Sequence, residues 1–211
     1  MCRLLLVKSK EEFEIATHLT AFAEIAKNSK EYQGHGWGCG FLRNEKWYLY
    51  KNLTPIWEDN LMRFGTTRLL IVHARSAFKN QGITVENNMP FFDGHYMFIF
   101  NGELQGVKLK ETGRTGAEKI YRFIKRFERG NLIQALEKAL GIIHRRTNYI
   151  KAMNIIMADK TRVYVTSCFS EDPEYFTLRF KQTNNLLIIC SEMYPGETNW
   201  LEIKNNSIEV F

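Results

Sequence analysis

The sequence has little that would indicate a disordered, repetitive or membrane-spanning chain. Its 211 residues include only 4 prolines and 14 glycines, and no segment repeats. No run approaches the roughly 18 apolar residues of a membrane span, and the apolar start at Leu4–Val7 is too short for a signal peptide. Hydrophobic residues make up 45%, enough to bury a core, and nothing reads as a linker. We therefore expect residues 1–211 to form a single domain without a membrane segment.

The sequence also lacks the usual patterns of metal, redox and cofactor sites. Its 4 cysteines include no CxxC pair, and its 5 histidines show no metal-ligand spacing. The glycine-rich segment 36–40 leads into a predicted strand rather than a helix, unlike a phosphate-binding loop. We expect no metal and no cofactor. Because no secretion signal precedes these cysteines, a reducing cytoplasm is the expected location.

Positive charge is in excess, with a formal net charge of +6. Part of the excess lies in two predicted helices, at Arg122, Lys125, Arg126, Arg129, Arg145 and Arg146. A basic surface can attract nucleic acid or anionic membranes. No aromatic-and-basic RNA motif or helix-turn-helix pattern accompanies these residues. We interpret them as the solvated faces of two helices, and we predict no nucleic-acid and no membrane partner.

Hydrophobic periodicity predicts strands on both sides of a helical pair. Predicted strands are 2–8, 36–42, 46–50, 68–74, 95–100, 151–158, 162–168, 175–181 and 186–190. A capping box at Ser9 and Glu12 predicts the start of a first helix, which ends near Asn28. A short helix is predicted at 57–64. A pair of helices is predicted at 116–128 and 131–145, and Thr115 and Glu118 form a second capping box at the start of the pair. This order indicates an α+β fold with antiparallel sheets in a layered sandwich.

Cys2 is a candidate nucleophile because of its position. Aminopeptidase removes an initiator methionine when a small residue follows, so removal of Met1 would place a thiol and a free α-amine on one residue. A thiolate is the nucleophilic form of cysteine, and an amine of pKa near 8 is a suitable base at neutral pH. On position alone, a small apolar residue opening a buried strand remains the favoured interpretation.

Two further positions suit amide chemistry. Arg75 ends a predicted strand, where a guanidinium can bind a carboxylate through two hydrogen bonds, although a surface ion pair explains it equally well. Asn101 and Gly102 follow another strand, and a side-chain amide beside an unhindered N–H can stabilise an oxyanion. By itself, Asn-Gly between apolar runs favours a hairpin turn.

Several segments, taken in order, form a pattern along nearly the whole chain. They are Met1–Leu5, Gly36–Phe41 (D-G-W-G-I-x-[FW]), His73–Arg75 (H-x-R), Glu86–Phe91 (N-x-H-P-F), Phe100–Gly102 (H-N-G), Thr115–Glu118 (T-D-S-E), and Ser191-Glu192 with Trp200–Ile203 and Ser207 (S-E-P, W-x-x-I and a last strand). Together they resemble the class II glutamine amidotransferase domain of the N-terminal-nucleophile hydrolase superfamily, and most closely its short stand-alone members.

The resemblance implies a four-layer αββα sandwich of two antiparallel sheets. It implies that Cys2 is the nucleophile and its own amine the base, that Arg75 binds the α-carboxylate of glutamine, and that Asn101 and the Gly102 N–H form the oxyanion hole. The reaction would release ammonia from a side-chain amide and leave a thioester on Cys2, which water hydrolyses. The resemblance also allows a partner synthetase that receives the ammonia.

The sequence departs from the family pattern at several pocket positions. Gly116 replaces the Asp that holds the substrate α-amine, Phe78 replaces a Thr, and Met89 replaces a His. Phe100 and His35 also replace a His and an Asp. These changes place glutamine in question as the substrate, because a desolvated ammonium without a partner is costly.

Two other carboxylates, Glu103 and Glu118, are candidates to supply the missing negative charge. The departures also favour a second hypothesis, a binding or regulatory protein that keeps the fold but recognises another metabolite.

Overall fold

The computed structural model describes residues 1–211 and contains two antiparallel sheets. The seven-stranded sheet has the order β11 (Leu201–Glu202), β9 (Arg179–Gln182), β10 (Leu186–Cys190), β1 (Arg3–Glu14), β4 (Thr66–Ala74), β2 (Trp37–Arg43), β3 (Lys46–Asn52). The five-stranded sheet has the order β12 (Ser207–Val210), β8 (Val163–Ser167), β7 (Tyr149–Ala158), β6 (Met97–Gln105), β5 (Phe91–Phe92). The helices are α1 (Ile15–Lys27), α2 (Gly116–Lys125), α3 (Leu132–Arg145) and α4 (Pro173–Phe176), with 3-10 turns η1 (Ile56–Glu58), η2 (Leu61–Phe64), η3 (Phe78–Asn80) and η4 (Val85–Asn87).

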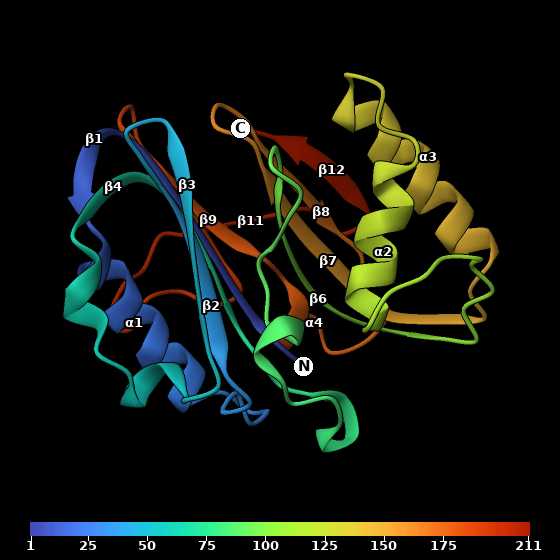
Figure 1. Ribbon diagram of the computed structural model, residues 1–211, viewed down its shortest axis with the longest axis horizontal. Helices are drawn as coiled ribbons and strands as arrows, with labels where there is room; N and C mark the ends of the chain where they lie inside the picture. The colour runs from blue at the N-terminus through green and yellow to red at the C-terminus, as the bar shows by residue number, and fades with distance from the viewer.

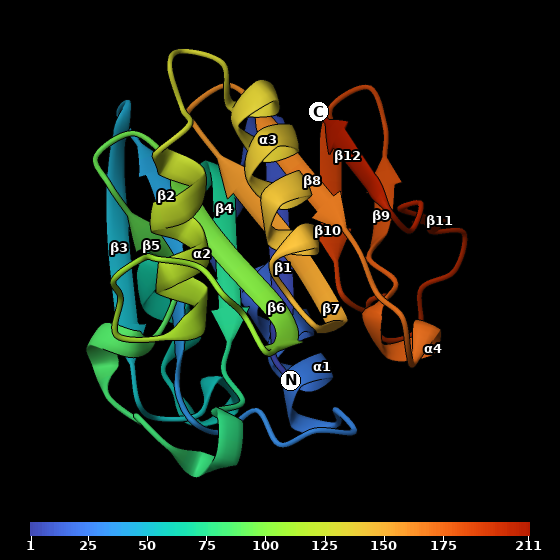
Figure 2. The same ribbon diagram turned by 90° about the vertical axis from the view of Figure 1, so that its right-hand side faces the viewer.

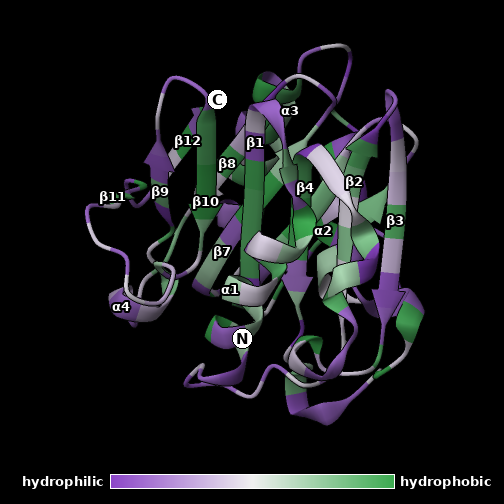
Figure 3. Ribbon diagram, turned by 90° about the vertical axis from the view of Figure 1, so that its left-hand side faces the viewer, coloured by the Kyte–Doolittle hydropathy of each residue, from purple (hydrophilic) through white to green (hydrophobic).

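The two sheets pack face to face between helices (Figure 1). Helix α1 covers the outer face of the seven-stranded sheet, and α2 with α3 covers the outer face of the five-stranded one (Figures 1 and 2). The residues of β1 alternate accordingly, since Leu5 and Val7 join the cluster under α1 while Leu4 and Leu6 join the cluster between the sheets. Viewed from the α1 side, β10 and the first half of β1 are hydrophobic, whereas the second half of β1 is mainly hydrophilic (Figure 3). The predicted four-layer αββα sandwich is confirmed.

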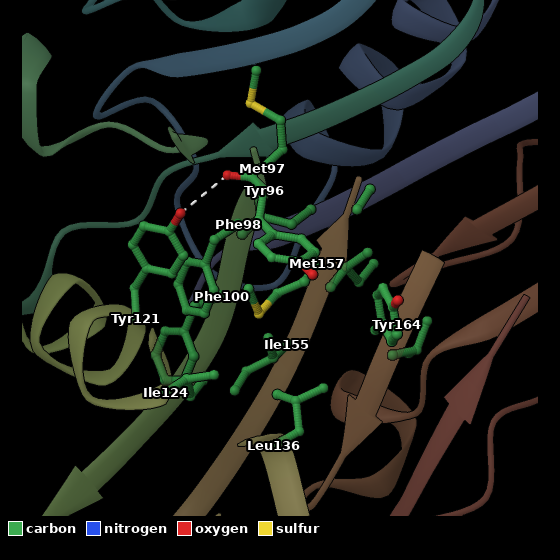
Figure 4. Packing of buried hydrophobic residues seen from close by; sticks show 14 of the residues in the cluster. Tyr96, Met97, Phe98, Phe100, Tyr121, Ile124, Leu136, Ile155, Met157 and Tyr164 are labelled. Atoms are coloured by element: carbon green, nitrogen blue, oxygen red, sulfur yellow. Dashed lines mark hydrogen bonds between the residues drawn. The ribbon is translucent and has the colours of Figure 1, made fainter. Parts of the chain in front are cut away.

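Strand β6 shows the same alternation in the second sheet. Phe98 and Phe100 point toward α2, and the rings of Phe98 and Tyr121 lie 4.8 Å apart (Figure 4). The Tyr121 hydroxyl donates a hydrogen bond of 3.0 Å to the Tyr96 carbonyl, which fixes α2 against β6. Because side chains alternate along a strand, Asn101 faces the opposite way, into the space between the sheets.

The predicted capping box at Ser9 and Glu12 is wrong. Strand β1 continues through Glu14, helix α1 starts at Ile15, and no side chain caps it. The Ser9 hydroxyl instead accepts a hydrogen bond of 3.1 Å from the Glu11 N–H. Pairing of Phe13 and Glu14 with β4 extends the strand beyond an irregularity, so sheet pairing overrides the local helix signal.

Asn101 and Gly102 do not form the hairpin turn that Asn-Gly by itself favours, because β6 continues to Gln105 and pairs with β7 across one irregularity. Two other predictions need correction. The strand predicted at 175–181 is shorter than expected. Its first two residues belong to the end of helix α4, and β9 starts only at Arg179. The short helix predicted at 57–64 is the pair of 3-10 turns η1 and η2. No helix is long and apolar enough to cross a membrane.

Candidate active site

The start of β1 brings Cys2 between the two sheets. The backbone N–H of Cys2 donates a hydrogen bond of 2.8 Å to Oδ1 of Asn101, which lies on β6 of the opposite sheet. The Cys2 Sγ lies 3.6 Å from the carbonyl oxygen of Ser76, just after β4. Both views of the fold place the chain start where β1 runs beside β6 (Figures 1 and 2). Residues about a hundred positions apart therefore meet at the thiol.

The side-chain amide of Asn101 has an N–H donor without a hydrogen-bond partner. The residue is fully buried, and its Nδ2 has no hydrogen-bond partner. Asn154 lies directly opposite on β7, yet both ends of its amide are bound, Nδ2 to the Phe176 carbonyl at 2.6 Å and Oδ1 to the Cys168 N–H at 3.2 Å. Buried polar groups are normally paired, so an unpaired amide nitrogen beside a thiol points to a group that arrives with a substrate.

Gly102 occupies a position that no larger residue fits. A Cβ there would overlap the carbonyl oxygen of Ala152 and the ring of Phe100. The backbone on both sides of this contact belongs to β6 and β7, which are hydrogen-bonded together. The glycine therefore lets the chain beside Asn101 approach its neighbours closely.

We expect Gly102→Ala to lower the free energy of unfolding by about 1 to 3 kcal/mol, the usual cost of overpacking. Chemical denaturation of the purified variants measures this. Gly116→Ala is the matched control, since a Cβ at Gly116 meets nothing within 4 Å, and it should leave stability unchanged or raised. Equal stability of the two variants would show that the close approach at Gly102 has no energetic consequence.

Arg75 is a buried guanidinium without an acidic partner. Its Nη1 donates to Oδ1 of Asn88 at 3.2 Å and its Nη2 donates to the Gly82 carbonyl at 2.8 Å. None of the ion pairs of the protein involves Arg75. Asn88 is itself fixed by a 2.8 Å hydrogen bond from its Nδ2 to the Asn52 carbonyl. A buried charge held only by neutral groups is suited to an incoming carboxylate.

The electrostatic surroundings of the thiol act in opposite directions. Burial raises the pKa of the Cys2 thiol, whereas the N-terminal ammonium and Arg75 lower that pKa. Nearby, the fully buried His73 has its pKa lowered to about 3, mainly by burial and then by Arg75, so its imidazole is neutral. Burial and Arg75 also lower the pKa of His35, whose Nδ1 accepts a hydrogen bond of 2.9 Å from the Ala77 N–H.

Met1 is held at the site by residues that the sequence did not single out. The Met1 carbonyl accepts hydrogen bonds from Nε2 of Gln33 and from the hydroxyl of Tyr175, each at 2.6 Å. The Met1 ammonium lies 3.8 Å from the carboxylate of Glu31. Local sequence carries no signal for these contacts, because Gln33 and Tyr175 reach Met1 only through the fold. Asn88 occupies the variable position of the N-x-H-P-F motif, so the motif does not identify it as a site residue.

The predicted substrate-binding residues lie in different environments. Gly116 is exposed at the first position of α2, where the Thr115 hydroxyl caps the helix by accepting a 3.1 Å hydrogen bond from the Glu118 N–H. Met89 is buried in the core between the sheets, while Phe78 is exposed at the surface in η3. The structure thus brings Cys2, Asn101 and Arg75 together, with Gly102 next to Asn101, and neither Met89 nor Phe78 hydrogen-bonds the thiol.

Of the two candidate carboxylates, Glu118 is not free to replace the missing Asp. Glu118 accepts hydrogen bonds from Arg114 and Arg122 at 2.9 Å each, and Arg114 above all lowers the pKa of Glu118 to about 2. Glu103 accepts a hydrogen bond of 2.9 Å from Gln105.

No cluster of three or more His, Cys, Asp or Glu side chains with the arrangement of a metal site occurs.

Two packed antiparallel sheets between helices, with the residue before β1 hydrogen-bonded to the opposite sheet, form the fold of N-terminal-nucleophile hydrolases. Residues 1–191 match the family of class-II glutamine amidotransferases, so the chain belongs to that family. None of the curated proteins matches the sequence significantly.

Solved structures agree with this assignment at the level of the fold. Glutamine phosphoribosylpyrophosphate amidotransferase from B. subtilis, complexed with ADP and GMP, has a TM-score of 0.70 and 16% identity; the match covers 100% of this chain and 49% of that one. A glutamine aminotransferase class-II domain protein from Silicibacter pomeroyi has a TM-score of 0.65 and 14% identity, covering 99% and 94%. A predicted glutamine amidotransferase from Pseudomonas aeruginosa has a TM-score of 0.61 and 15% identity, covering 100% and 97%. The chain thus spans about half of the B. subtilis enzyme and nearly all of the other two.

Proposed function

We propose that this protein is an amidohydrolase that uses Cys2 as an N-terminal nucleophile and releases ammonia from a side-chain amide. Once Met1 is removed, the nitrogen of Cys2 becomes an α-amine that stays beside Oδ1 of Asn101. The amine takes the thiol proton, and the thiolate adds to the amide carbon. Nδ2 of Asn101 and the Gly102 N–H stabilise the oxyanion.

The intermediate then collapses with breakage of the C–N bond. The proton held by the amine passes to the leaving nitrogen, ammonia departs, and an acyl thioester remains on Cys2. Water, deprotonated by the same amine, attacks the thioester, and the carboxylic acid leaves while the thiol regains its proton. No cofactor takes part in this cycle. A reducing compartment, which the sequence predicts, suits it because the thiol must stay free.

One observation carries the proposal. The backbone nitrogen of Cys2 lies 2.8 Å from Oδ1 of Asn101, while Nδ2 of the same buried amide has no partner. Base, nucleophile and oxyanion donor are thereby within reach of one carbonyl group. Asn154, opposite Asn101 on β7, uses both ends of its amide within the protein.

The buried guanidinium of Arg75 supports a substrate with a carboxylate, such as glutamine or a related amide. The ammonia could pass to a partner synthetase, as the family membership suggests. The absence of an acidic side chain at Gly116 supports a second candidate, a binding or regulatory protein with the same fold that turns its ligand over slowly or not at all. In that case the ligand would bind near Arg75 without forming a thioester.

The deciding experiment uses protein shown by intact mass to have lost Met1. Ammonia release is measured with glutamine, asparagine and ω-amides of dicarboxylic acids that lack the α-amine, and the protein is then searched for acylated Cys2. Ammonia release with a transient thioester supports the enzyme. Binding of such an amide without either product supports the binding protein. A retained Met1 would deprive Cys2 of its own amine and count against the enzymatic proposal.

We expect Gly116→Asp to raise kcat/KM for glutamine about tenfold, since a carboxylate there would pair with the substrate ammonium. The helix start has room for it, because a Cβ at Gly116 meets nothing within 4 Å. Steady-state kinetics measure the change, with Gly116→Asn as the control of equal size and no charge. An equal response of the two variants, or no response, would contradict an α-amine position beside residue 116.

A further inference from the structure

A cavity of about 710 Å³ lies between α2 and the edge strands β3 and β5. Figure 2 shows α2 crossing the five-stranded sheet near β5. The lining contains the cations Lys51, Arg114, Arg122, Lys125 and Arg126 and the carboxylates Asp93, Glu111 and Glu118. Cations therefore outnumber carboxylates around a cavity that is open to solvent. Arg122 and Arg126 belong to the expected solvated face of a helix, and they line this cavity while remaining exposed to solvent.

A buried carboxylate orients two of the guanidiniums. Glu118 is only 6% exposed, and it accepts hydrogen bonds from Nε of Arg114 at 2.9 Å, from Nη2 of Arg114 at 3.1 Å and from Nη2 of Arg122 at 2.9 Å. Both arginine side chains are about half exposed, so their remaining N–H groups stay available. Two guanidiniums fixed by one carboxylate carry a net positive charge with little freedom left to lose on binding.

Lys51 adds a cation that no carboxylate neutralises. It is partly buried on β3, forms none of the ion pairs of the protein, and has its ammonium 5.3 Å from the centre of the Phe91 ring. Burial, followed by the charge of Arg114, lowers the pKa of Lys51 to about 8, with the carboxylates of Glu118 and Glu86 acting in the opposite direction. An anion in the cavity would stabilise this ammonium, which the protein alone leaves unpaired.

We infer that this cavity binds a small polyanion through Lys51, Arg114 and Arg122, with phosphoryl or carboxylate groups as the recognised chemistry. The wall formed by Phe91 and Phe92 gives the ligand an apolar side. Three cations that line one cavity select for several negative charges on one molecule rather than for a single anion.

The cavity adjoins the candidate active site without being part of it. Lys51 precedes Asn52, whose carbonyl accepts the hydrogen bond from Asn88, and Asn88 in turn holds Arg75. The cavity lining includes neither Cys2 nor Arg75. The inference therefore does not depend on the activity proposed for Cys2, and it can be tested with protein that has no measurable turnover.

The test is isothermal titration of the full chain at low ionic strength with inorganic pyrophosphate and, separately, with citrate. We expect saturable binding of one equivalent, weakened at least about tenfold by Lys51→Met. Lys46→Met on the same strand is the matched control, because Lys46 is exposed outside the cavity, and it should change affinity less than about twofold. Tighter binding of pyrophosphate would assign a phosphoryl ligand, and tighter binding of citrate a polycarboxylate.

A second pair of variants tests the inference independently, in case Lys51→Met does not fold. Arg122→Gln should weaken binding by a similar factor, while Arg129→Gln, outside the cavity, should not. Thermal unfolding without ligand confirms that each variant is folded. Absence of saturable binding for both probes overturns the inference, as does an equal loss in Lys46→Met and Lys51→Met. Tighter binding of a single-stranded oligonucleotide than of either probe, lost in the same variants, would also overturn it in favour of an extended nucleic-acid surface.

Discussion

Cys2→Ala is expected to reduce kcat for ammonia release by at least about a thousandfold, because no other group at the site can form the acyl thioester. Alanine is also small, so removal of Met1 should proceed as in the wild type and leave the α-amine in place. The variant thus loses the sulfur alone. Its measurement is steady-state ammonia release together with intact mass, which should show acylation of the wild type by substrate and none of the variant.

Cys168→Ala is the matched control for this prediction. Cys168 is a thiol with a histidine beside it, since its Sγ lies 3.8 Å from Nε2 of His144, the last-turn histidine of α3. If Cys168 carried the chemistry, its substitution would abolish ammonia release and Cys2→Ala would retain it. Normal activity in Cys168→Ala, with loss in Cys2→Ala, is the result that the proposed mechanism requires.

Alternating hydrophobic residues made most of the fold predictable. The strand at 68–74 and the helix ending near Asn28 were correct because each combines a clear period with a polar boundary. The predicted helix start at Ser9 is wrong because pairing with β4 stabilises β1 more than the local cap would stabilise a helix. The Asn-Gly dipeptide by itself favours a turn at Asn101 and Gly102, but none forms, because β7 pairs with β6 through Gln105. Long-range pairing is not visible in a local window.

The candidate site was predictable where its residues lie inside ordered motifs. Cys2, Arg75 and Asn101 fall on such positions, and the fold brings all three to one place. The residues around them were not predictable, since Gln33 and Tyr175 contact Met1 only after α1 and α4 have packed beside β1. Spacing along the chain identifies groups of the right chemical type, whereas hydrogen-bond geometry decides which of them remain unpaired.

Hydrogen-bond geometry also explains why the role of Glu118 differs from the role that the sequence predicts. In the sequence it was a free carboxylate close to Gly116 and a candidate partner for a substrate ammonium. In the folded chain, Arg114 and Arg122 neutralise it and lower its pKa to about 2. Its role then turns from binding a cation to orienting two cations. The proposed change in substrate preference and the inferred anion-binding cavity thus both trace to the start of α2.

Asn101→Asp is expected to lower kcat by about a hundredfold to a thousandfold, the usual cost of losing one oxyanion donor. The substitution keeps an oxygen acceptor for the nitrogen of Cys2 but removes the unpaired Nδ2 and adds negative charge where the oxyanion would form. KM should change little, because the ground-state amide gains little from a donor directed at the tetrahedral oxygen. Steady-state kinetics with the amide that the wild type hydrolyses best gives both constants.

Asn154→Asp separates this catalytic effect from a structural one. Asn154 faces Asn101 across β6 and β7 and is equally buried, yet both ends of its amide are bonded within the protein. Its substitution breaks the bond to the Phe176 carbonyl and should cost about 1 to 3 kcal/mol of stability, with kcat of the folded fraction largely kept. Asn101→Asp breaks no bond made by Nδ2, so it should lose kcat far more than stability. If the two variants lost kcat to the same extent, Asn101 would be a packing residue, and the oxyanion would have to be stabilised elsewhere.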